Sequence, residues 1–476
     1  MKKVVIIGGG IAGLAAAYSL REHQTPDTPD FEIILLEKNN RLGGNIRTEK
    51  TDGFLIEGGP DCFISEKPWA MELCKRIGLG DKILPTNEGG KTYVLSGGKL
   101  HILPDGVILM VPTKMLPLAT STLISWAGKI RMASEIFVPK KKGREDETLG
   151  QFVRRRLGQE ALDKIAEPLV AGVHAGDPET MSVRASFPKF VQLEEEYGSL
   201  IKGMIKRMEL LKKTHKPQAS AGPKKKVTMF MTLKDGLSEM IDTLTTILLK
   251  TNTRIEKGVA VTGVTKKNNG YEVALDGGKS IEADAVVIAA PAYAAANVLS
   301  RFDADLSQKL LTIPYVSTAT VSIAFKKSDV KHPLNGFGFV VPKIEKRRIM
   351  AATWTSRKFS FRAPDDTVLI RCFVGGSKNM ELVNLSDPEM IKMVKEELRD
   401  TMGITAEPVL VKVFRWINSM PQYTVGHEDR IKWIEERLAN HPGLYLTGSA
   451  YHGIGISDSI RIGEVVAKKI LHQLKN

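Results

Sequence analysis

The residues from Gly8 to Gly13 have the spacing that a dinucleotide pyrophosphate requires. The stretch VVIIGGGIAG at 4–13 ends a short apolar run, of the length of one buried strand, in closely spaced glycines. Gly8 permits a tight turn, and Gly10 lets backbone amides approach the pyrophosphate. Gly13 allows the next helix to pack closely on the strand. That helix directs its N-terminal amides at the phosphates.

Glu37 is the second residue whose type and position indicate a role in ligand binding. It closes another apolar run, FEIILLE at 31–37, where an acid can accept hydrogen bonds from the hydroxyl pair of a ribose. The polar insert HQTPDTPD at 23–30 lengthens the spacing and predicts a longer surface loop. A GxGxxG pattern alone is weak, but here strand, glycines, helix, strand and acid follow in order. The order predicts a nucleotide-binding unit of the α/β class.

The stretch RLGGNIRT at 41–48 comes just after this acid. The adjacent Gly43 and Gly44 let the backbone pass close to a ligand, and Arg41 can pair with a phosphate. An ordinary turn between strands is the alternative. The nearness to Glu37 weakens that alternative, because both groups would face one ligand.

Glycine-rich backbone also occurs at two other places. In GFLIEGGPD at 53–61, a strand enters a bend at Gly59, which suits backbone passing beside a flat ring system; a plain turn is the alternative. In GSAYHGIGISD at 448–458, glycine-rich backbone leads into the last helix. A helix N-terminus stabilises a partial negative charge. Ser457 or Asp458 would equally serve there as a simple N-cap.

The composition is that of an ordinary globular protein with a basic balance. The chain has 476 residues, of which 42% are hydrophobic and 26% charged, and its formal net charge is +14. That length accommodates two or three domains. The charge favours an anionic partner, either an acidic small molecule or an anionic membrane surface. No nucleic acid is expected, because the basic runs 140–142, 154–156 and 224–226 are short and lack interleaved aromatics.

Cysteine usage and hydropathy indicate a cytoplasmic protein. Three scattered cysteines fit a reducing compartment and predict no zinc site or other metal site. The chain opens directly into its first strand, so no signal peptide is expected. The longest uncharged helical candidate, 115–128, contains Pro117 and is too short to span a bilayer. It could rest on a membrane surface or line an apolar pocket, and a packed helix is the alternative.

Signals of a nucleotide-binding unit recur in separated segments. The second of them contains short strands broken by Asn-Gly and Gly-Gly turns, and the third contains a strand, a glycine-rich turn and a long helix. Other domains are therefore expected to be inserted between them. The three segments that we assign to the nucleotide-binding unit are 1–63, 228–299 and 441–476.

The two inserts differ in pattern. One alternates apolar stretches with basic helical faces and ends in KTHKPQASAGPKKK, which predicts an exposed, mobile loop. The other mixes strand-like runs such as TATVSIAF with helices, which predicts an α+β substrate domain. We expect a helical domain over 107–227 and a substrate domain built from 64–106 and 300–440.

These motifs together resemble the superfamily of FAD-dependent amine oxidases and protoporphyrinogen oxidases, and within it the bacterial oxygen-dependent porphyrinogen oxidases of haem synthesis. The resemblance runs nearly end to end. The stretches that carry it are EGGPDCFISEKP (57–68), EPLVAGVHAGDPETMSV (167–183), RWINSMPQYTVGH (415–427) and LTGSAYHGIGISDSI (446–460).

The resemblance implies a Rossmann-like FAD-binding domain of the amine-oxidase type, an α+β substrate domain and a helical, membrane-facing insert. It implies that the last helix faces the edge of the flavin where negative charge collects on reduction, and that backbone at Val261 binds the adenine side. The residues that it assigns to FAD are Gly8, Gly10, Ile11, Ala12, Gly13, Glu37, Lys38, Arg41, Gly43, Gly44, Gly59, Val261, Trp416, Gly448, Gly455, Ile456 and Ser457.

The implied reaction is the six-electron oxidation of coproporphyrinogen III to coproporphyrin III, with O2 as acceptor and hydrogen peroxide as by-product. No protein base is strictly required, so no catalytic side chain is assigned. Lys67 stands where relatives place a cation for a propionate, and Val173 where an apolar side chain contacts the macrocycle. His174 and Phe373 stand where relatives carry tyrosines. A surface lysine and core side chains are the structural alternatives.

The substrate choice rests on charge. Coproporphyrinogen has four propionates and protoporphyrinogen two, so a basic chain favours the former; oxidation of protoporphyrinogen IX is the first alternative. A flavin amine oxidase, a carotenoid desaturase, a nicotinamide dehydrogenase and a non-catalytic flavin-containing porphyrin carrier are further alternatives. The resemblance also suggests the ferrochelatase of the same pathway and the inner face of the membrane as partners. It leaves the oligomeric state open.

Overall fold

A computed structural model describes residues 1–25, 30–108, 111–112, 115–214 and 226–475. Residues 26–29 of the expected loop at 23–30, and residues 215–225 of that at 213–226, lie outside the described residues. The chain divides into two compact units. The first combines Met1–Thr86, Val227–Pro314 and Asp429–Asn476, and the second combines Asn87–Lys226 and Tyr315–Glu428.

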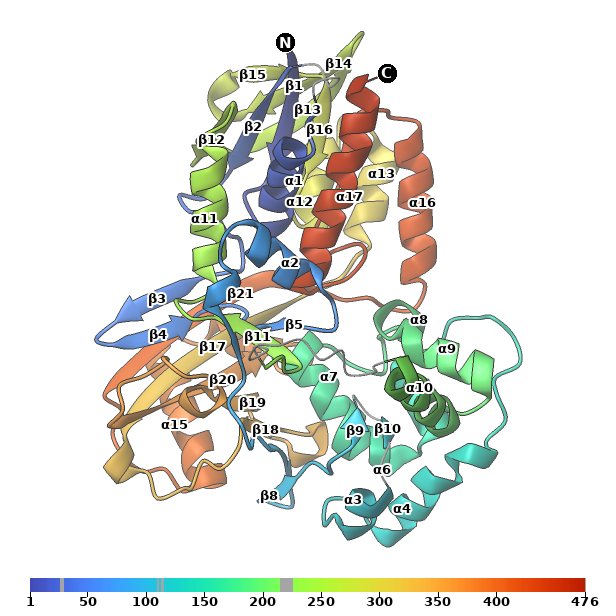
Figure 1. The fold of residues 1–476 in the computed structure, drawn as a ribbon, viewed down its shortest axis with the longest axis vertical. Helices are drawn as coiled ribbons and strands as arrows, with labels where there is room; N and C mark the ends of the chain where they lie inside the picture. Colours follow the sequence, from blue (N-terminus) through green and yellow to red (C-terminus); the bar gives the residue numbers. More distant parts are fainter. Residues whose placement is uncertain (26–29, 109–110, 113–114, 215–225, 476) are drawn as a thin grey trace. The chain divides into compact units, whose positions relative to one another are not determined.

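A five-stranded parallel sheet forms the centre of the first unit (Figure 1). Its three central strands are apolar along most of their length, as expected for a sheet covered on both faces. Helices α1 (Ile11–Glu22), α11 (Ser238–Leu248) and α17 (Ile456–Lys475) contribute to the apolar core against it. The sheet order is β12 (Thr253–Lys257), β2 (Phe31–Glu37), β1 (Lys2–Ile7), β16 (Ala285–Ile288) and β22 (Leu444–Leu446). This arrangement confirms the expected α/β fold class.

Smaller sheets and helices complete the first unit. The antiparallel sheet β13–β14–β15 follows β12 in the chain, and β3 and β4 form a hairpin. Their bounds are β3 (Thr48–Thr51), β4 (Phe54–Glu57), β5 (Phe63–Ile64), β6 (Ile83–Pro85), β11 (Phe230–Leu233), β13 (Val261–Lys267), β14 (Gly270–Leu275) and β15 (Ser280–Ala283). The remaining helices are α2 (Trp69–Arg76), α12 (Ala292–Leu299), α13 (Ala304–Leu311) and most of α16 (His427–Ala439).

The boundaries of this unit differ from the expected 1–63, 228–299 and 441–476. The segment 64–86 belongs to it because β5 and β6 both pair with β11, and because Leu73 and Cys74 of α2 enter its core. The segments 300–314 and 429–440 belong to it as well. There, Asp303 before α13 pairs with Arg437 of α16.

A seven-stranded sheet runs through the second unit. One of its faces packs against α15 (Asp387–Met402) around a core that includes Trp354 and Cys372. In spatial order its strands are β21 (Leu410–Pro421), β17 (Tyr315–Lys326), β20 (Thr367–Gly375), β19 (Ile349–Trp354), β18 (Gly338–Val340), β7 (Thr92–Ser96) and β8 (Lys99–Ile102).

The helical part of this unit has its own apolar core, which includes Phe152 and Ile165. In contrast to the expected separate domain over 107–227, it belongs to one compact unit with the sheet. Its helices are α3 (Met115–Thr120), α4 (Trp126–Ala133), α5 (Leu149–Arg156), α6 (Gln159–Ala161), α7 (Glu167–His174), α8 (Val183–Ser186), α9 (Pro188–Tyr197) and α10 (Leu200–Thr214). A short hairpin of β9 (Val107–Ile108) and β10 (Val111–Pro112) precedes them.

The prediction of one helix over 115–128 is wrong. The chain leaves the helical conformation after α3, and Ser125 adopts an extended backbone as the N-cap of α4. Its hydroxyl accepts from Gly128 N and donates to Glu160 Oε2 at 2.6 Å. Among the residues described, no helix combines the length and apolar composition needed to cross a bilayer.

Candidate functional site

The carboxyl ends of the parallel strands meet at one edge of the first unit's sheet, where open α/β sheets bind their ligands. Gly8 leaves β1 with φ +112°, and a Cβ there would overlap the Ala289 carbonyl oxygen. A Cβ at Gly13 would overlap the Gly8 carbonyl oxygen. At Gly10, by contrast, the nearest atom would be Gly44 Cα at 4.0 Å. The first two glycines therefore close the turn, and Gly10 leaves room beside it.

The second glycine motif lies against the first. Gly43 forms an isolated parallel bridge with Gly10, and Gly43 N donates to Gly9 O at 2.8 Å. The Arg41 guanidinium donates to the carbonyl oxygens of Leu42, Gly44 and Ile46 and so fixes the loop. Burial lowers the pKa of Arg41. A phosphate contact of Arg41 stays a prediction.

Glu37 organises the same edge. It is buried, its Oε2 accepts from Gly9 N at 2.8 Å, and its Oε1 accepts from Asn39 N and Nδ2. A carboxylate offers about four lone-pair sites, so these donors leave capacity for a hydroxyl. Val259 N donates to Glu37 O at 3.0 Å, which brings the start of β13 at Val261 close to this acid. Lys38 is exposed beside it.

Gly59 lies buried in the bend after β4. The nearby Glu57 was not predicted as a functional or structural residue. It is buried, and it accepts from Leu237 N at 2.8 Å and from Thr48 Oγ1 at 2.7 Å. Glu57 thus ties the β3–β4 hairpin to the start of α11. The signal for it is an acid inside an apolar strand that enters paired glycines.

The end of β22 carries two features that suit a bound ligand. Thr447 is fully buried, and its Oγ1 has no hydrogen-bond partner among the residues that the structure describes. Gly448 follows with φ +125°, and a Cβ there would meet no atom within 4 Å. A buried hydroxyl without a partner is costly, so a ligand group would stabilise it.

Helix α17 begins with Ile456, so Ser457 and Asp458 lie in its first turn and are not its N-cap. The helix packs closely on α1, since a Cβ at Gly463 would lie 2.5 Å from Ala12 O (Figure 1). The Ser457 hydroxyl donates to Lys67 O at 3.1 Å, and Lys67 Nζ lies 2.6 Å from Asp458 Oδ2. Lys67 therefore has a protein partner at its charged end.

The other predicted substrate residues lie in the second unit. Val173 is 58% exposed near the end of α7, and the His174 ring meets Phe187 edge-on at 5.3 Å. The half-buried Phe373 packs with Met350 in a small apolar cluster on the sheet face away from α15. Ala175, the residue after His174, belongs to the same cluster. The structure thus brings these three candidates to one region.

Trp416 lies in the second unit, on β21 opposite Thr318 of β17. The glycine motifs, Glu37 and Val261 all lie in the first unit. Sequence reasoning missed Arg371, which is 4% exposed and places its guanidinium 4.8 Å from the centroid of the Phe373 ring. The two residues are two positions apart on β20 and so share one face of the sheet, and the signal for Arg371 is an arginine inside an apolar strand.

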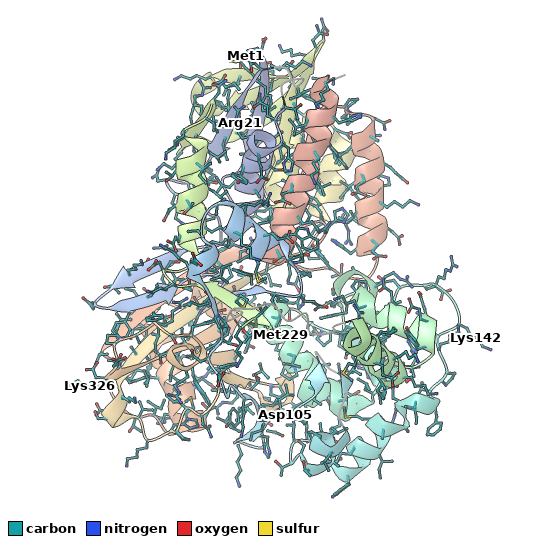
Figure 2. The ribbon with its side chains drawn as sticks, viewed as in Figure 1. Met1, Arg21, Asp105, Lys142, Met229 and Lys326 are labelled. Carbon is teal, nitrogen blue, oxygen red and sulfur yellow. The ribbon has the colours of Figure 1, made fainter. Side chains whose placement is uncertain are left out.

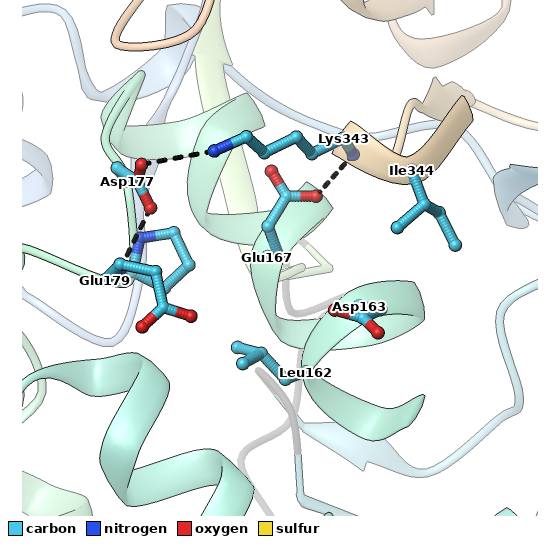
Figure 3. A pocket seen from close by; sticks show the side chains of 8 residues that line it. Leu162, Asp163, Glu167, Asp177, Glu179, Lys343 and Ile344 are labelled. Carbon is cyan, nitrogen blue, oxygen red and sulfur yellow. Dashed lines mark hydrogen bonds and ion pairs between the residues drawn. The ribbon is translucent and has the colours of Figure 1, made fainter. Parts of the chain in front are cut away.

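A pocket of about 310 Å³ lies elsewhere in the second unit (Figure 3). Carboxylates of Asp163, Glu167, Asp177 and Glu179 line it, and Lys343 enters it. Lys343 Nζ lies 3.6 Å from Asp177 Oδ2, and Lys343 N donates to Glu167 Oε2 at 2.8 Å. This acidic lining would repel a propionate, and none of the predicted site residues belongs to it.

Taken from the first unit alone, the geometry fits FAD. The start of α1 suits the pyrophosphate, Glu37 suits the ribose, and the open backbone at Gly448 beside the start of α17 suits a ring that gains negative charge. The unpartnered Thr447 hydroxyl and the open sides of Gly10 and Gly448 are the observations that this fit explains.

Comparisons with known proteins agree with this geometry. Residues 11–471 match the family described as flavin containing amine oxidoreductase. Coproporphyrinogen III oxidase of Bacillus subtilis is 39% identical, over 99% of this chain and 98% of that protein. The Staphylococcus aureus protein of the same name is 33% identical, over 99% of this chain and 100% of its own. A crystal structure of a putative protoporphyrinogen oxidase from Exiguobacterium superposes with a TM-score of 0.85, at 33% identity, covering 99% of each chain.

Proposed function

This chain belongs to the flavin containing amine oxidoreductase family and is an FAD-dependent oxidoreductase; from that premise we propose that it oxidises coproporphyrinogen III to coproporphyrin III. The observation that carries the proposal is the 39% identity to a coproporphyrinogen III oxidase over 99% of the chain. The net charge of +14 supports a substrate with four propionates.

The proposed reaction removes six electrons and six protons from the macrocycle. Three molecules of O2 accept them and leave as three molecules of hydrogen peroxide. When bound, FAD supplies the two-electron acceptor that links substrate to oxygen. The chain's own task is to hold the cofactor and to orient the substrate.

We assign that task to residues in both units. In the first unit, the amides at Gly10–Gly13 would hold the pyrophosphate, and Glu37 with backbone at Val261 would hold the adenosine end. In the second unit, Val173, His174 and Phe373 would form an apolar and aromatic wall for the macrocycle. The assignment of Trp416 to the cofactor is also proposed, from the resemblance alone.

Side-by-side turnover tests the function. Purified, FAD-loaded protein would be supplied aerobically with coproporphyrinogen III and with protoporphyrinogen IX, while porphyrin fluorescence and peroxide are followed. We expect faster formation of coproporphyrin, with about three peroxides per porphyrin. No porphyrin above the rate of autoxidation with either substrate would overturn the proposal.

Protoporphyrinogen IX is the second candidate substrate. It is favoured by the 33% identity and the TM-score of 0.85 to the structure named as a putative protoporphyrinogen oxidase. Preferential turnover of protoporphyrinogen in the same assay would establish it.

We also propose peripheral contact with an anionic membrane. Four large apolar side chains, which we call the apolar patch, are 68–80% exposed on α3, α4 and the turn after it: Leu116, Trp126, Ile130 and Phe137. Trp126 and Ile130 are one helical turn apart, and the Lys129 ammonium lies 4.2 Å from the Trp126 ring centroid. Figure 2 labels Lys142, one of the lysines at 140–142 that follow the patch.

Vesicle sedimentation tests this contact. Each of the substitutions Trp126→Ser and Phe137→Ser is expected to weaken binding to phosphatidylglycerol vesicles about tenfold, because each removes one exposed aromatic side chain that would insert into the membrane. Phe361→Ser, which alters a side chain 61% exposed elsewhere in the same unit, is the matched control. Equal binding of all variants would contradict the proposal.

Product transfer suggests one protein partner. The product is a planar, metal-free porphyrin, so we propose a ferrochelatase as the enzyme that receives it. Cosedimentation of the two purified proteins, with and without coproporphyrin, tests that association.

A further inference from the structure

We propose that the ion pair of Lys67 and Asp458 tunes the reduction potential of the bound flavin. In this pair, Lys67 acts through Asp458, whose negative charge it neutralises. The inference rests on the FAD-binding part of the proposed function and is independent of which substrate is oxidised. It replaces the expectation that Lys67 pairs with a propionate.

The first observation is that Lys67 is tied to α17 at both of its ends. Its ammonium lies 2.6 Å from Asp458 Oδ2, and its carbonyl oxygen accepts from the Ser457 hydroxyl at 3.1 Å. Lys67 stands between β5 and α2, so these contacts connect that segment to the first turn of α17.

The second observation is that the Asp458 carboxylate is enclosed. Its side chain is 8% exposed, whereas that of Lys67 is 44% exposed. The glycine loop before α17 wraps this carboxylate: a Cβ at Gly453 would lie 2.5 Å from Asp458 Cγ, and one at Gly455 would lie 3.4 Å from its Oδ2. Glycine at 453 is therefore explained by the acid, whereas the contact at 455 is an ordinary one.

The electrostatic consequence has a definite sign. The start of α17 carries the positive end of the helix dipole, which stabilises a flavin that gains negative charge on reduction. The Asp458 carboxylate opposes this effect, and the Lys67 ammonium cancels the carboxylate. A screened pair leaves the helix terminus attractive to the reduced cofactor. Removing the Lys67 ammonium should therefore lower the reduction potential of the flavin, and removing the Asp458 carboxylate should raise it.

The test is the reduction potential of the bound flavin, measured without any porphyrinogen against a reference dye. We expect Lys67→Met to raise the ratio of oxidised to reduced flavin at a fixed potential about tenfold, or about 30 mV for a two-electron couple. Asp458→Asn should lower that ratio, and the double variant should return towards the wild type. Lys67→Arg, which keeps the positive charge, should leave the ratio of oxidised to reduced flavin as it is in the wild type.

Lys82→Met is the matched control, because it removes a lysine of the same unit whose acidic partners, Asp235 and Glu239, do not belong to α17. An unchanged potential in Lys67→Met and Asp458→Asn, with a raised KM for coproporphyrinogen in Lys67→Met, would overturn the proposal and restore the propionate role. If Lys67→Met fails to retain FAD, the potential of Asp458→Asn decides, since an unchanged value there also overturns it. Failure to oxidise any porphyrinogen would overturn the proposed function but would leave these potentials unchanged, because they are measured without substrate.

Discussion

Gly10 and Gly13 are both glycines at the start of α1, yet their surroundings give them different tasks. Gly13 faces the Gly8 carbonyl oxygen with no room for a methyl group, and Gly10 faces open space. The GxGxxG spacing could be predicted to bind a nucleotide from the sequence. Which glycine serves packing and which serves the ligand follows from the neighbours in space.

We expect Gly13→Ala to destabilise the protein by about 1–3 kcal/mol, because the added methyl group overpacks the strand–helix contact. Gly10→Ala should leave the stability of the FAD-free protein within about 0.5 kcal/mol, which is typical away from packed features, but weaken FAD binding. Urea unfolding without FAD and titration with FAD measure the two effects. Equal loss of stability in both variants would contradict this division of tasks.

Lys67 shows the limit of residue-by-residue inference. The sequence motif alone could not reveal that its partner is Asp458, since the two residues are far apart in the chain and meet only when α17 docks beside β5. Glu57 was missed for the same reason, because Leu237, which donates to it, comes from another segment.

At the scale of elements, the parallel strands and the long helices could be predicted from apolar runs and glycines. The set of residues that share one face of the second unit's sheet could not be predicted. Phe373 and Trp416 lie on β20 and β21, and both strands pair with β17, where their partners are Thr320 and Thr318. That register depends on pairing between strands about 50–100 residues apart, and the sequence pattern carries no signal for it.

The pairing of α13 with α16 gives a prediction about acid stability. Asp303 accepts from Leu306 N at the start of α13 and from both Arg437 Nε and Nη2 of α16, at 2.6 and 3.1 Å. The hydrogen bonds from Arg437 hold the pKa of Asp303 far below its ordinary value. Asn at this position keeps the cap but loses the charge.

We therefore expect Asp303→Asn to lower the free energy of unfolding by about 1–2 kcal/mol at pH 7. The depressed pKa means that the stabilisation is fully present above about pH 4, the ordinary range of aspartate, and is lost as the pH falls below it. The difference between the wild type and the variant should shrink steadily in chemical denaturation as the pH is lowered from about 4 towards about 2. A constant difference from pH 7 to pH 2 would show that the charge contributes nothing.

At the scale of the whole molecule, the proposed cofactor site is assembled from chain segments that other elements separate. The glycines at 8–13, the acid at 37, the backbone at 259–261 and the strand end at 447–448 all belong to one compact unit. This discontinuity could be predicted, because each segment carries its own signal. The exact boundaries could not be predicted, since short strands such as β5 and β6 join the unit only by pairing with β11.

A ligand held by all of these segments should protect them together. We expect FAD to slow amide hydrogen exchange at once in residues 8–14, 37–46, 259–263 and 447–458, and to raise the free energy of unfolding by about 2.7 kcal/mol at a hundredfold excess over Kd. Helix α15 of the second unit is the internal control, because it packs on the sheet face away from Phe373. Protection confined to 8–14 and 37–46 would mean that the C-terminal segment does not hold the cofactor. The tuning role of Lys67 and Asp458 would then lose its basis as well, because it requires the flavin to lie at the start of α17.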